Sequence, residues 1–253
     1  MTGRSIDHVA LTVRDLPAMA GFYRDALGLS PLGGDGGTER LGAGGRVLLE
    51  LRRDTAAKPR DPHQAGLFHT AFLLPGRADL AEWLRHAADQ GIRLTGASDH
   101  GVSEALYLDD PEGNGIEIYR DRPAAEWVRR GERIEMFTRR LDRNGLLAAA
   151  RKPWAGMPGG STVGHVHLQV GDLDRAAKFF AGDLALTRSF DGPGGLWYGW
   201  DGYHHHLAGN VWNSAGAGPR DPETAGLAEV AIRDADRAGG SVTDPWGTRF
   251  RFV

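Results

Sequence analysis

Histidines and glutamates recur at the ends of short apolar stretches in this sequence, where they could hold a metal ion. His69 and Glu117 flank one such unit, and His165 opens a similar stretch further along the chain. Two imidazoles and one carboxylate are the ligand set that holds ferrous iron on one face and leaves other positions open. The sequence therefore predicts a metal centre assembled from residues that are far apart in the chain.

The second histidine of this ligand set has two candidates. In an earlier stretch, His8 and Glu50 occupy the positions that His69 and Glu117 occupy in theirs. His8 could therefore complete the site, and so could His165. Residues His8, Glu50, His69 and Glu117 would together offer four protein ligands, which is a different kind of centre.

An internal repeat underlies these equivalent positions. Residues 8–29 (HVALTVRDLPAMAGFYRDALGL) and 165–186 (HVHLQVGDLDRAAKFFAGDLAL) share ten of 22 positions without a gap. A second pair, PRDPHQAGL at 59–67 and PRDPETAGL at 219–227, also matches. Self-similarity of this kind predicts duplicated structural units. In the last unit, Glu229 and Arg251 stand where His69 and Glu117 stand, and a guanidinium at a ligand position repels a cation.

Four units of one pattern can be drawn along the chain, each a strand, a helix and further strands. Alternating apolar residues predict the strands, and Asp15 is a suitable N-cap for the first helix. The last unit is truncated because the short run ADRAGGSV replaces its helix. The predicted strands are 8–13, 46–52, 67–74, 104–108, 116–119, 227–232 and 248–253, and the predicted helices are 16–27 and 78–90.

The units group into two halves of the chain. Residues 1–120 hold the first and second units, residues 121–160 read as a linker with a helix near 140–150, and residues 161–253 hold the third unit and the truncated fourth. The length of 253 residues suits this division.

The composition excludes several classes of protein. The formal net charge is −3 at pH 7, so nothing argues for a nucleic-acid partner or an anionic membrane surface. The sequence contains no cysteine, which excludes disulfides and thiolate ligands. No apolar run is long enough to predict a membrane span, and no secretory signal is visible. We expect a cytoplasmic enzyme, and a homo-oligomer is compatible with the sequence.

The sequence resembles the vicinal oxygen chelate superfamily, which includes glyoxalase I, bleomycin resistance proteins and extradiol dioxygenases. Residues 98–123 (SDHGVSEALYLDDPEGNGIEIYRDRP), 164–170 (GHVHLQV) and 202–212 (GYHHHLAGNVW) are similar to the catechol 2,3-dioxygenase branch. The resemblance covers nearly the whole chain and weakens over the last unit. It implies an α+β fold in which four βαβββ-type modules, the last one truncated, pair into two open barrel-like mixed sheets.

The resemblance also implies catalytic residues. Tyr107 lies ten residues before Glu117, as in the extradiol pattern. His100, followed by Gly101, fits a histidine that lies beside the metal ligands of such enzymes without binding the metal, although its spacing to the tyrosine is two residues shorter. An acid–base histidine is expected on a strand of the partner unit, and the run 204–206 supplies it. Strand alternation places His204 and His206 on one face and His205 on the other, and His205 is the predicted acid–base residue.

The expected acid–base histidine indicates which two units form the metal site. Residues 44–53 of the first unit contain no histidine, whereas the third unit offers the run 204–206. We therefore predict that units two and three pair, with His69, Glu117 and His165 as metal ligands. The opposing arrangement pairs units one and two and uses His8 and Glu50.

The predicted activity is Fe(II)-dependent extradiol cleavage of a catechol with O2 to a hydroxymuconic semialdehyde, and Mn(II) suits the same ligands. The partners would be a small aromatic diol and O2, with Trp197, Trp200 and Trp212 as candidate walls of an aromatic pocket. One alternative is a glyoxalase I-like metal-dependent lyase or isomerase. A second is a resistance protein that binds an aromatic ligand without catalysis.

Overall fold

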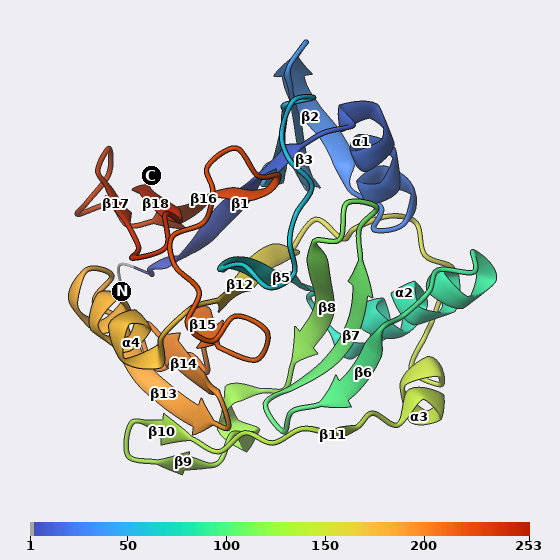
Figure 1. Cartoon of the computed structure of the whole chain (residues 1–253). Helices are drawn as coiled ribbons and strands as arrows, with labels where there is room; N and C mark the ends of the chain where they lie inside the picture. The colour runs from blue at the N-terminus through green and yellow to red at the C-terminus, as the bar shows by residue number, and fades with distance from the viewer. Residues whose placement is uncertain (1–2) are drawn as a thin grey trace.

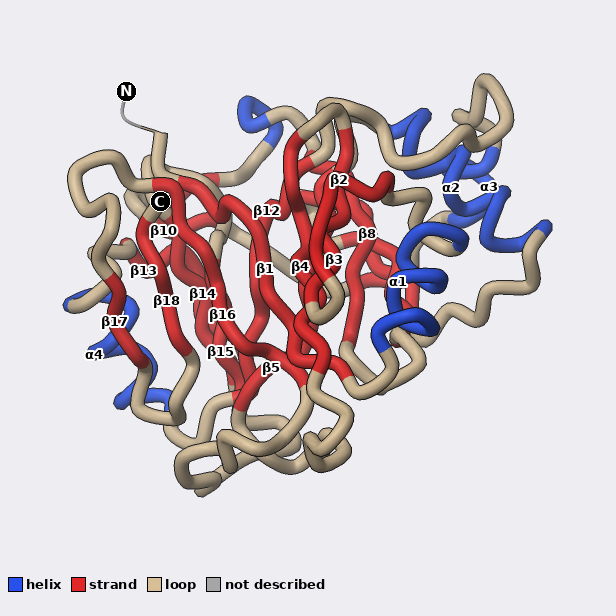
Figure 2. The backbone as a smooth tube through the Cα atoms, turned by 90° about the horizontal axis from the view of Figure 1, so that it is seen from above, coloured by secondary structure: helices blue, strands red, loops and turns tan. Residues whose placement is uncertain are grey.

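Residues 3–253 are described by a computed structural model, in which two curved mixed sheets lie side by side with helices on their outer flanks (Figure 1). Helix α4 lies at one side of the molecule, and α1, α2 and α3 lie at the other (Figure 2). This is the α+β architecture that the sequence predicted. The helices are α1 (Leu16–Asp25), α2 (Arg77–Asp89), α3 (Arg143–Leu147), α4 (Leu173–Gly182) and the 3-10 turn η1 (Ala124–Glu126).

The larger sheet has nine strands and unites the second unit with the third. Its central pair is β5 against β12, which run antiparallel. In spatial order its strands are β11 (Arg139–Arg140), β6 (Gly96–Asp99), β7 (Ser103–Asp109), β8 (Gly115–Asp121), β5 (Gly66–Leu73), β12 (Thr162–Gln169), β15 (Leu207–Asn210), β14 (Gly195–Gly199) and β13 (Thr187–Gly192).

The smaller sheet has seven strands and unites the first unit with the fourth. Its central pair is β1 against β16, also antiparallel. A separate hairpin is formed by β9 (Arg129–Arg130) and β10 (Arg133–Ile134). The order in the sheet is β17 (Ser241–Thr243), β18 (Arg249–Phe252), β16 (Gly226–Arg233), β1 (Ser5–Val13), β4 (Arg46–Arg53), β3 (Thr38–Ala43) and β2 (Ser30–Asp35).

The two sheets therefore have the crossed pairing of units that the sequence favoured. Each sheet takes one unit from the first part of the chain and one from the last, so the two halves of the chain interleave. Figure 1 shows β5 and β12 side by side although about 90 residues of chain separate them. The expected boundaries of the halves at residues 120 and 160 stay a prediction.

Local sequence explains the helices. The Asp15 carboxylate accepts a hydrogen bond from the backbone N–H of Ala18 at the start of α1, and Asp172 caps α4 in the same way at Arg175. Gly28 follows α1 with φ of +73°, a conformation that glycine adopts without strain. The fourth unit has only turns between β16 and β17, as the short run ADRAGGSV predicted.

Strand alternation separates the core from the open face of each sheet. In β12, Val166 and Leu168 are fully buried and join one large apolar cluster, to which Val9 and Leu11 of β1 also belong. The alternate residue His165 faces the other side of the sheet. Among residues 3–253, no helix has the length and apolar character needed to cross a membrane.

Candidate metal centre

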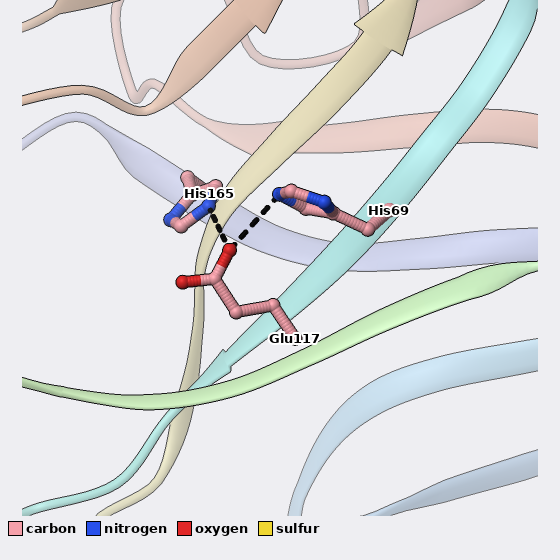
Figure 3. A group of neighbouring side chains, drawn as sticks. All are labelled: His69, Glu117 and His165. Carbon is pink, nitrogen blue, oxygen red and sulfur yellow. Dashed lines mark hydrogen bonds and ion pairs between the residues drawn. The ribbon is translucent and has the colours of Figure 1, made fainter. Parts of the chain in front are cut away.

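Three strands bring His69, Glu117 and His165 together on the open face of the nine-stranded sheet (Figure 3). The Oε2 atom of Glu117 lies 3.0 Å from Nε2 of His69 and 3.2 Å from Nε2 of His165. The three side chains are buried, and their ligand atoms all lie within 4.8 Å of one another. The structure thus assembles the predicted ligand set from β5, β8 and β12.

Strand register explains why these three side chains meet. Ala71 of β5 pairs with His165 on one side and with Glu117 on the other. His69 lies two residues earlier on the same strand and therefore on the same face. Because Ala71 carries only a methyl group, the imidazole and the carboxylate can approach each other above it.

The carboxylate is ionised in this environment. Burial would raise the pKa of Glu117, but the neighbouring imidazoles of His165 and His69 outweigh it and lower the pKa well below its ordinary value. Burial lowers the pKa of His165, and the charge of Glu117 opposes this shift. A buried carboxylate between two imidazoles favours a cation at their centre.

The donor atoms fit a metal ion. Ligand atoms at right angles around an ion, with bonds of about 2.1 Å, lie about 3 Å apart, and the two distances to Glu117 agree with this. Nε2 of His69 is buried and its contact with Glu117 lacks hydrogen-bond geometry. An unpaired buried nitrogen costs free energy, and a bound ion would remove that cost.

Tyr107 and His100 form a hydrogen-bonded pair beside the ligands. Nε2 of His100 lies 2.8 Å from the Tyr107 hydroxyl, and its Nδ1 lies 3.0 Å from the carbonyl oxygen of Phe137. The carbonyl can only accept, so Nδ1 carries the proton and Nε2 accepts from the tyrosine. Burial, with the charge of Glu117, raises the pKa of Tyr107 well above its ordinary value, so the phenol stays protonated.

His205 reaches the same region from the chain just before β15. The histidine run therefore does not lie within a strand, and the strand alternation predicted for residues 204–206 is wrong there. The structure nevertheless separates the three side chains: His206 accepts a hydrogen bond from the backbone of Trp200, whereas the ring of His205 lies 4.1 Å from that of His165. Burial lowers the pKa of His205 well below its ordinary value, as do the neighbouring histidines, so its ring is neutral.

All six predicted site residues line a single cavity of about 690 Å³. Its other walls include the aromatic side chains of Phe68, Phe190, Trp197 and Trp212. Trp200 does not contribute, because it is buried and donates to the carbonyl of Leu184.

The segment 121–160 also contributes to the cavity, which the sequence did not predict. Met136, Phe137 and Thr138 line it, and Phe137 binds His100 through its carbonyl. His167 lines it as well and lies opposite His69 across β5 and β12. The sequence did indicate His167, because it follows His165 by two residues and so lies on the same face of the strand. Nothing in the irregular sequence near Phe137 indicated that this residue lines the site.

The alternative ligand set does not form. His8 and Glu50 lie on the seven-stranded sheet, remote from His69 and Glu117 in the other sheet. Glu50 accepts from Arg40 and Arg52, at 2.8 and 2.7 Å, rather than facing an imidazole. In the same sheet, Arg251 donates to Glu229 at 2.8 Å. On this sheet, arginine guanidinium groups therefore pair with the glutamates, at the positions that correspond to those of the candidate metal ligands on the other sheet.

Several known proteins are similar to this chain in sequence. A family model described as Glyoxalase/Bleomycin resistance protein/Dioxygenase superfamily matches residues 5–118. The chain is 38% identical over 230 residues to a catechol-2,3-dioxygenase of Bacillus subtilis (strain 168), covering 88% of this chain and 80% of that protein. It is 33% identical over 117 residues to a biphenyl-2,3-diol 1,2-dioxygenase 3 of Rhodococcus globerulus, covering 45% and 62%.

Solved structures share the fold. Glyoxalase I from Zea mays aligns with a TM-score of 0.58 at 15% identity, over 99% of this chain and 92% of that one. The cppA protein from Streptococcus pneumoniae TIGR4 aligns with a TM-score of 0.55 at 12% identity, over 98% and 99%. At such identities the likeness concerns the fold alone. The sequence matches show that the chain belongs to the Glyoxalase/Bleomycin resistance protein/Dioxygenase superfamily.

Proposed function

We propose that this protein is an extradiol ring-cleaving dioxygenase that acts on a catechol or a substituted catechol. The observation that carries the proposal is the meeting of His69, Glu117 and His165 with a neutral His205 in one aromatic-walled cavity. The similarity to a catechol-2,3-dioxygenase over most of the chain supports the same reaction class.

His69, Glu117 and His165 would hold Fe(II), or Mn(II), which prefers similar ligands. When bound, the ion would supply Lewis-acid chemistry toward the diol and one-electron chemistry toward O2. Three protein ligands leave the remaining positions to these two reactants. The partners are thus a small aromatic diol and O2, and the product, a hydroxymuconic semialdehyde, contains both oxygen atoms of O2.

His205 would handle the protons of the reaction. Its neutral ring can accept a proton from one catechol hydroxyl, and the resulting imidazolium can return that proton as the ring opens. The Tyr107 hydroxyl, whose hydrogen is donated to His100, would accept a hydrogen bond from a substrate hydroxyl and so orient it, and His100 would hold the tyrosine in place. These roles need only small movements because all three side chains line the same cavity.

The aromatic wall favours an aromatic substrate over a small aliphatic one. The ring centroids of Phe68 and Trp212 lie 5.3 Å apart, and that of Trp197 lies 6.5 Å from Trp212. Such rings bind a flat substrate by stacking and by edge contacts. The cavity of about 690 Å³ would accept a catechol that carries a ring substituent.

The test is anaerobic reconstitution with Fe(II), followed by addition of catechol, 3-methylcatechol or 3-phenylcatechol in air. Absorbance at the violet end of the visible range, where a yellow product absorbs, and O2 uptake would be recorded together. We expect a yellow product in step with O2 consumption. Iron-loaded protein that consumes no O2 with any of these diols would overturn the proposal and favour a lyase or a ligand-binding protein.

A further inference from the structure

A chain of hydrogen bonds leads from His205 away from the cavity to a carboxylate. Nδ1 of His205 lies 2.7 Å from Nδ1 of His204, and Nε2 of His204 lies 2.8 Å from Oδ1 of Asp121. His204 is fully buried, and the Asp121 side chain is about one-fifth exposed. His204 therefore connects His205 with a partly buried negative charge.

The carboxylate fixes which nitrogen carries each proton. An ionised carboxylate can only accept, so Nε2 of His204 donates to Asp121. In a neutral ring, Nδ1 of His204 is then an acceptor, and Nδ1 of His205 must donate to it. This leaves Nε2 of His205 with its lone pair, and among residues 3–253 no side chain or backbone group hydrogen-bonds to that atom.

Asp121 is itself held in position. The Tyr203 hydroxyl donates to Oδ2 of Asp121 at 2.8 Å, and the Tyr119 hydroxyl lies 2.9 Å from that of Tyr203. Because Tyr203 already donates to the carboxylate, Tyr119 donates to Tyr203. Both carboxylate oxygens are thus occupied, one by a tyrosine and one by His204.

The same strand carries the metal-site carboxylate and this one. Glu117, Tyr119 and Asp121 occupy alternate positions of β8, so they lie on one face. The glutamate end of that face reaches the ligand cluster, and the aspartate end reaches His204. One strand therefore sets the ligand and the acid–base group relative to each other.

We propose that Asp121 and His204 are positioning residues that hold His205 in the tautomer with Nδ1 protonated and Nε2 free to accept a proton from the substrate. The inference rests on the proposed function for the identity of the proton donor, a catechol hydroxyl. When Nε2 takes that proton, the imidazolium donates from Nδ1 to His204, and Asp121 stabilises the charge through His204.

The first test measures tautomers without any metal or substrate. Two-bond 1H–15N correlation spectra of the metal-free, 15N-labelled protein distinguish Nδ1–H from Nε2–H histidines. We expect the Nδ1–H form for His205 in the wild type, and loss of that preference in Asp121→Ala and in His204→Phe. An Nε2–H form of His205 in the wild type, or an unchanged tautomer in both variants, would overturn the proposal.

The second test measures turnover by the Fe(II)-loaded protein. We expect Asp121→Ala to lower kcat by about 10- to 100-fold while KM for the diol changes less than about threefold, because proton transfer is affected rather than binding. The matched control is Asp89→Ala, which removes an exposed carboxylate at the end of α2. If Asp121→Ala does not fold, His204→Phe, which keeps an aromatic ring in the buried position, takes its place.

The two tests separate this inference from the proposed function. If the wild type cleaves no diol, the proposed function fails. The tautomer of His205 alone then decides whether Asp121 and His204 position it. If the wild type cleaves catechol and Asp121→Ala does so at the same kcat, the positioning role is wrong although the proposed function stands.

Discussion

Glu117 lies at the centre of the candidate ligand cluster. Its Oε2 atom is shared by two imidazole nitrogens, and its side chain is almost completely excluded from water. A carboxylate in such a place is stabilised only by positive charge or by strong hydrogen-bond donors. The same residue type on the other sheet, Glu50, obtains that charge from arginines instead. Metal affinity should therefore distinguish the two glutamates.

We expect Glu117→Gln to weaken Mn(II) binding by at least about 100-fold, because an amide oxygen carries no charge to hold the ion. Glu50→Gln, the matched control, should leave Mn(II) affinity unchanged within twofold. Calorimetric titration of each variant with Mn(II) measures both values. Loss of binding in Glu50→Gln alone would instead support the alternative ligand set with His8.

His206 should make the protein sensitive to acid. Burial, together with the neighbouring His204 and His165, lowers the pKa of His206 from its ordinary value of 6.5 to about 3. Between pH 6.5 and pH 3 the imidazole of His206 is therefore protonated in the unfolded chain but neutral in the folded protein. Because protonation stabilises only the unfolded chain in this range, the free energy of unfolding falls as pH falls from about 6.5 toward 3. Between pH 7 and pH 5 this one group should lower the free energy of unfolding by about 2 kcal/mol.

The measurement is urea unfolding at pH 7 and pH 5 for the wild type and for His206→Gln, which keeps an acceptor for the backbone of Trp200. We expect the variant to lose about 2 kcal/mol less than the wild type over this interval. Equal losses in the two proteins would show that His206 takes up its proton in the folded state as readily as in the unfolded chain.

At the scale of elements, β12 packs closely against β5 and β8 next to the candidate metal centre. Gly164 precedes His165, and a methyl group placed there would lie 1.8 Å from the Tyr119 hydroxyl and 3.0 Å from Cβ of Leu73. The glycine is therefore required for the close contact between β12, β8 and β5. This contact also keeps the Tyr119 hydroxyl against Tyr203.

Gly164→Ala should lower the free energy of unfolding by about 1–3 kcal/mol, the usual cost of overpacking a core. Gly182→Ala in α4 is the control, because nothing lies within 4 Å of its added methyl group. In that helix alanine should leave stability unchanged or raise it by up to about 1 kcal/mol. Denaturant unfolding curves compare the two, and a Gly164→Ala variant as stable as Gly182→Ala would contradict the close packing.

At the scale of the whole molecule, the crossed pairing separates the candidate metal centre from an arginine-rich sheet. Strands β5, β8 and β12 carry the candidate ligands, whereas β4 and β16 of the other sheet carry Glu50 and Glu229, which pair with arginines. The duplicated units thus differ in chemistry according to the partner against which each one is paired.

A cysteine pair can test the crossed pairing directly, because the sequence has no cysteine of its own. Thr162 and Leu73 are register partners on β12 and β5, and such partners lie about 4.5–5.5 Å apart between Cα atoms, within reach of a disulfide. We expect Leu73→Cys with Thr162→Cys to form an intramolecular cross-link on oxidation, detected by mobility in non-reducing gels.

The control pair is Leu73→Cys with Ser5→Cys, since Ser5 occupies in the first unit the position of Thr162 in the third. Ser5 pairs with Arg233 instead, so this pair should not cross-link. An intramolecular cross-link between residues 5 and 73, and none between 73 and 162, would mean that the first and second units pair.

Much of this protein could be read from its sequence. Strand alternation and the capping residue Asp15 predicted α1, α2 and seven of the strands within a few residues, because these signals are local. No bounds were predicted for the strands and the helix of the third unit. The repeat predicted duplicated units, and the spacing of Tyr107 to Glu117 pointed to residues that do line one cavity. The contribution of Phe137 was missed because an irregular segment has no periodicity to reveal which side chains turn inward.

The sequence by itself determined which residue types were available as ligands, and it favoured His165 without excluding His8. Only the tertiary structure shows which of the two lies beside His69 and Glu117, because it pairs β12 rather than β1 with β5. The physical reason is that β1 and β12 have nearly the same local sequence and apolar pattern, so no local preference distinguishes them. Their partners are chosen by long-range packing, and the same packing places Asp121 next to His204, 83 residues away in the chain.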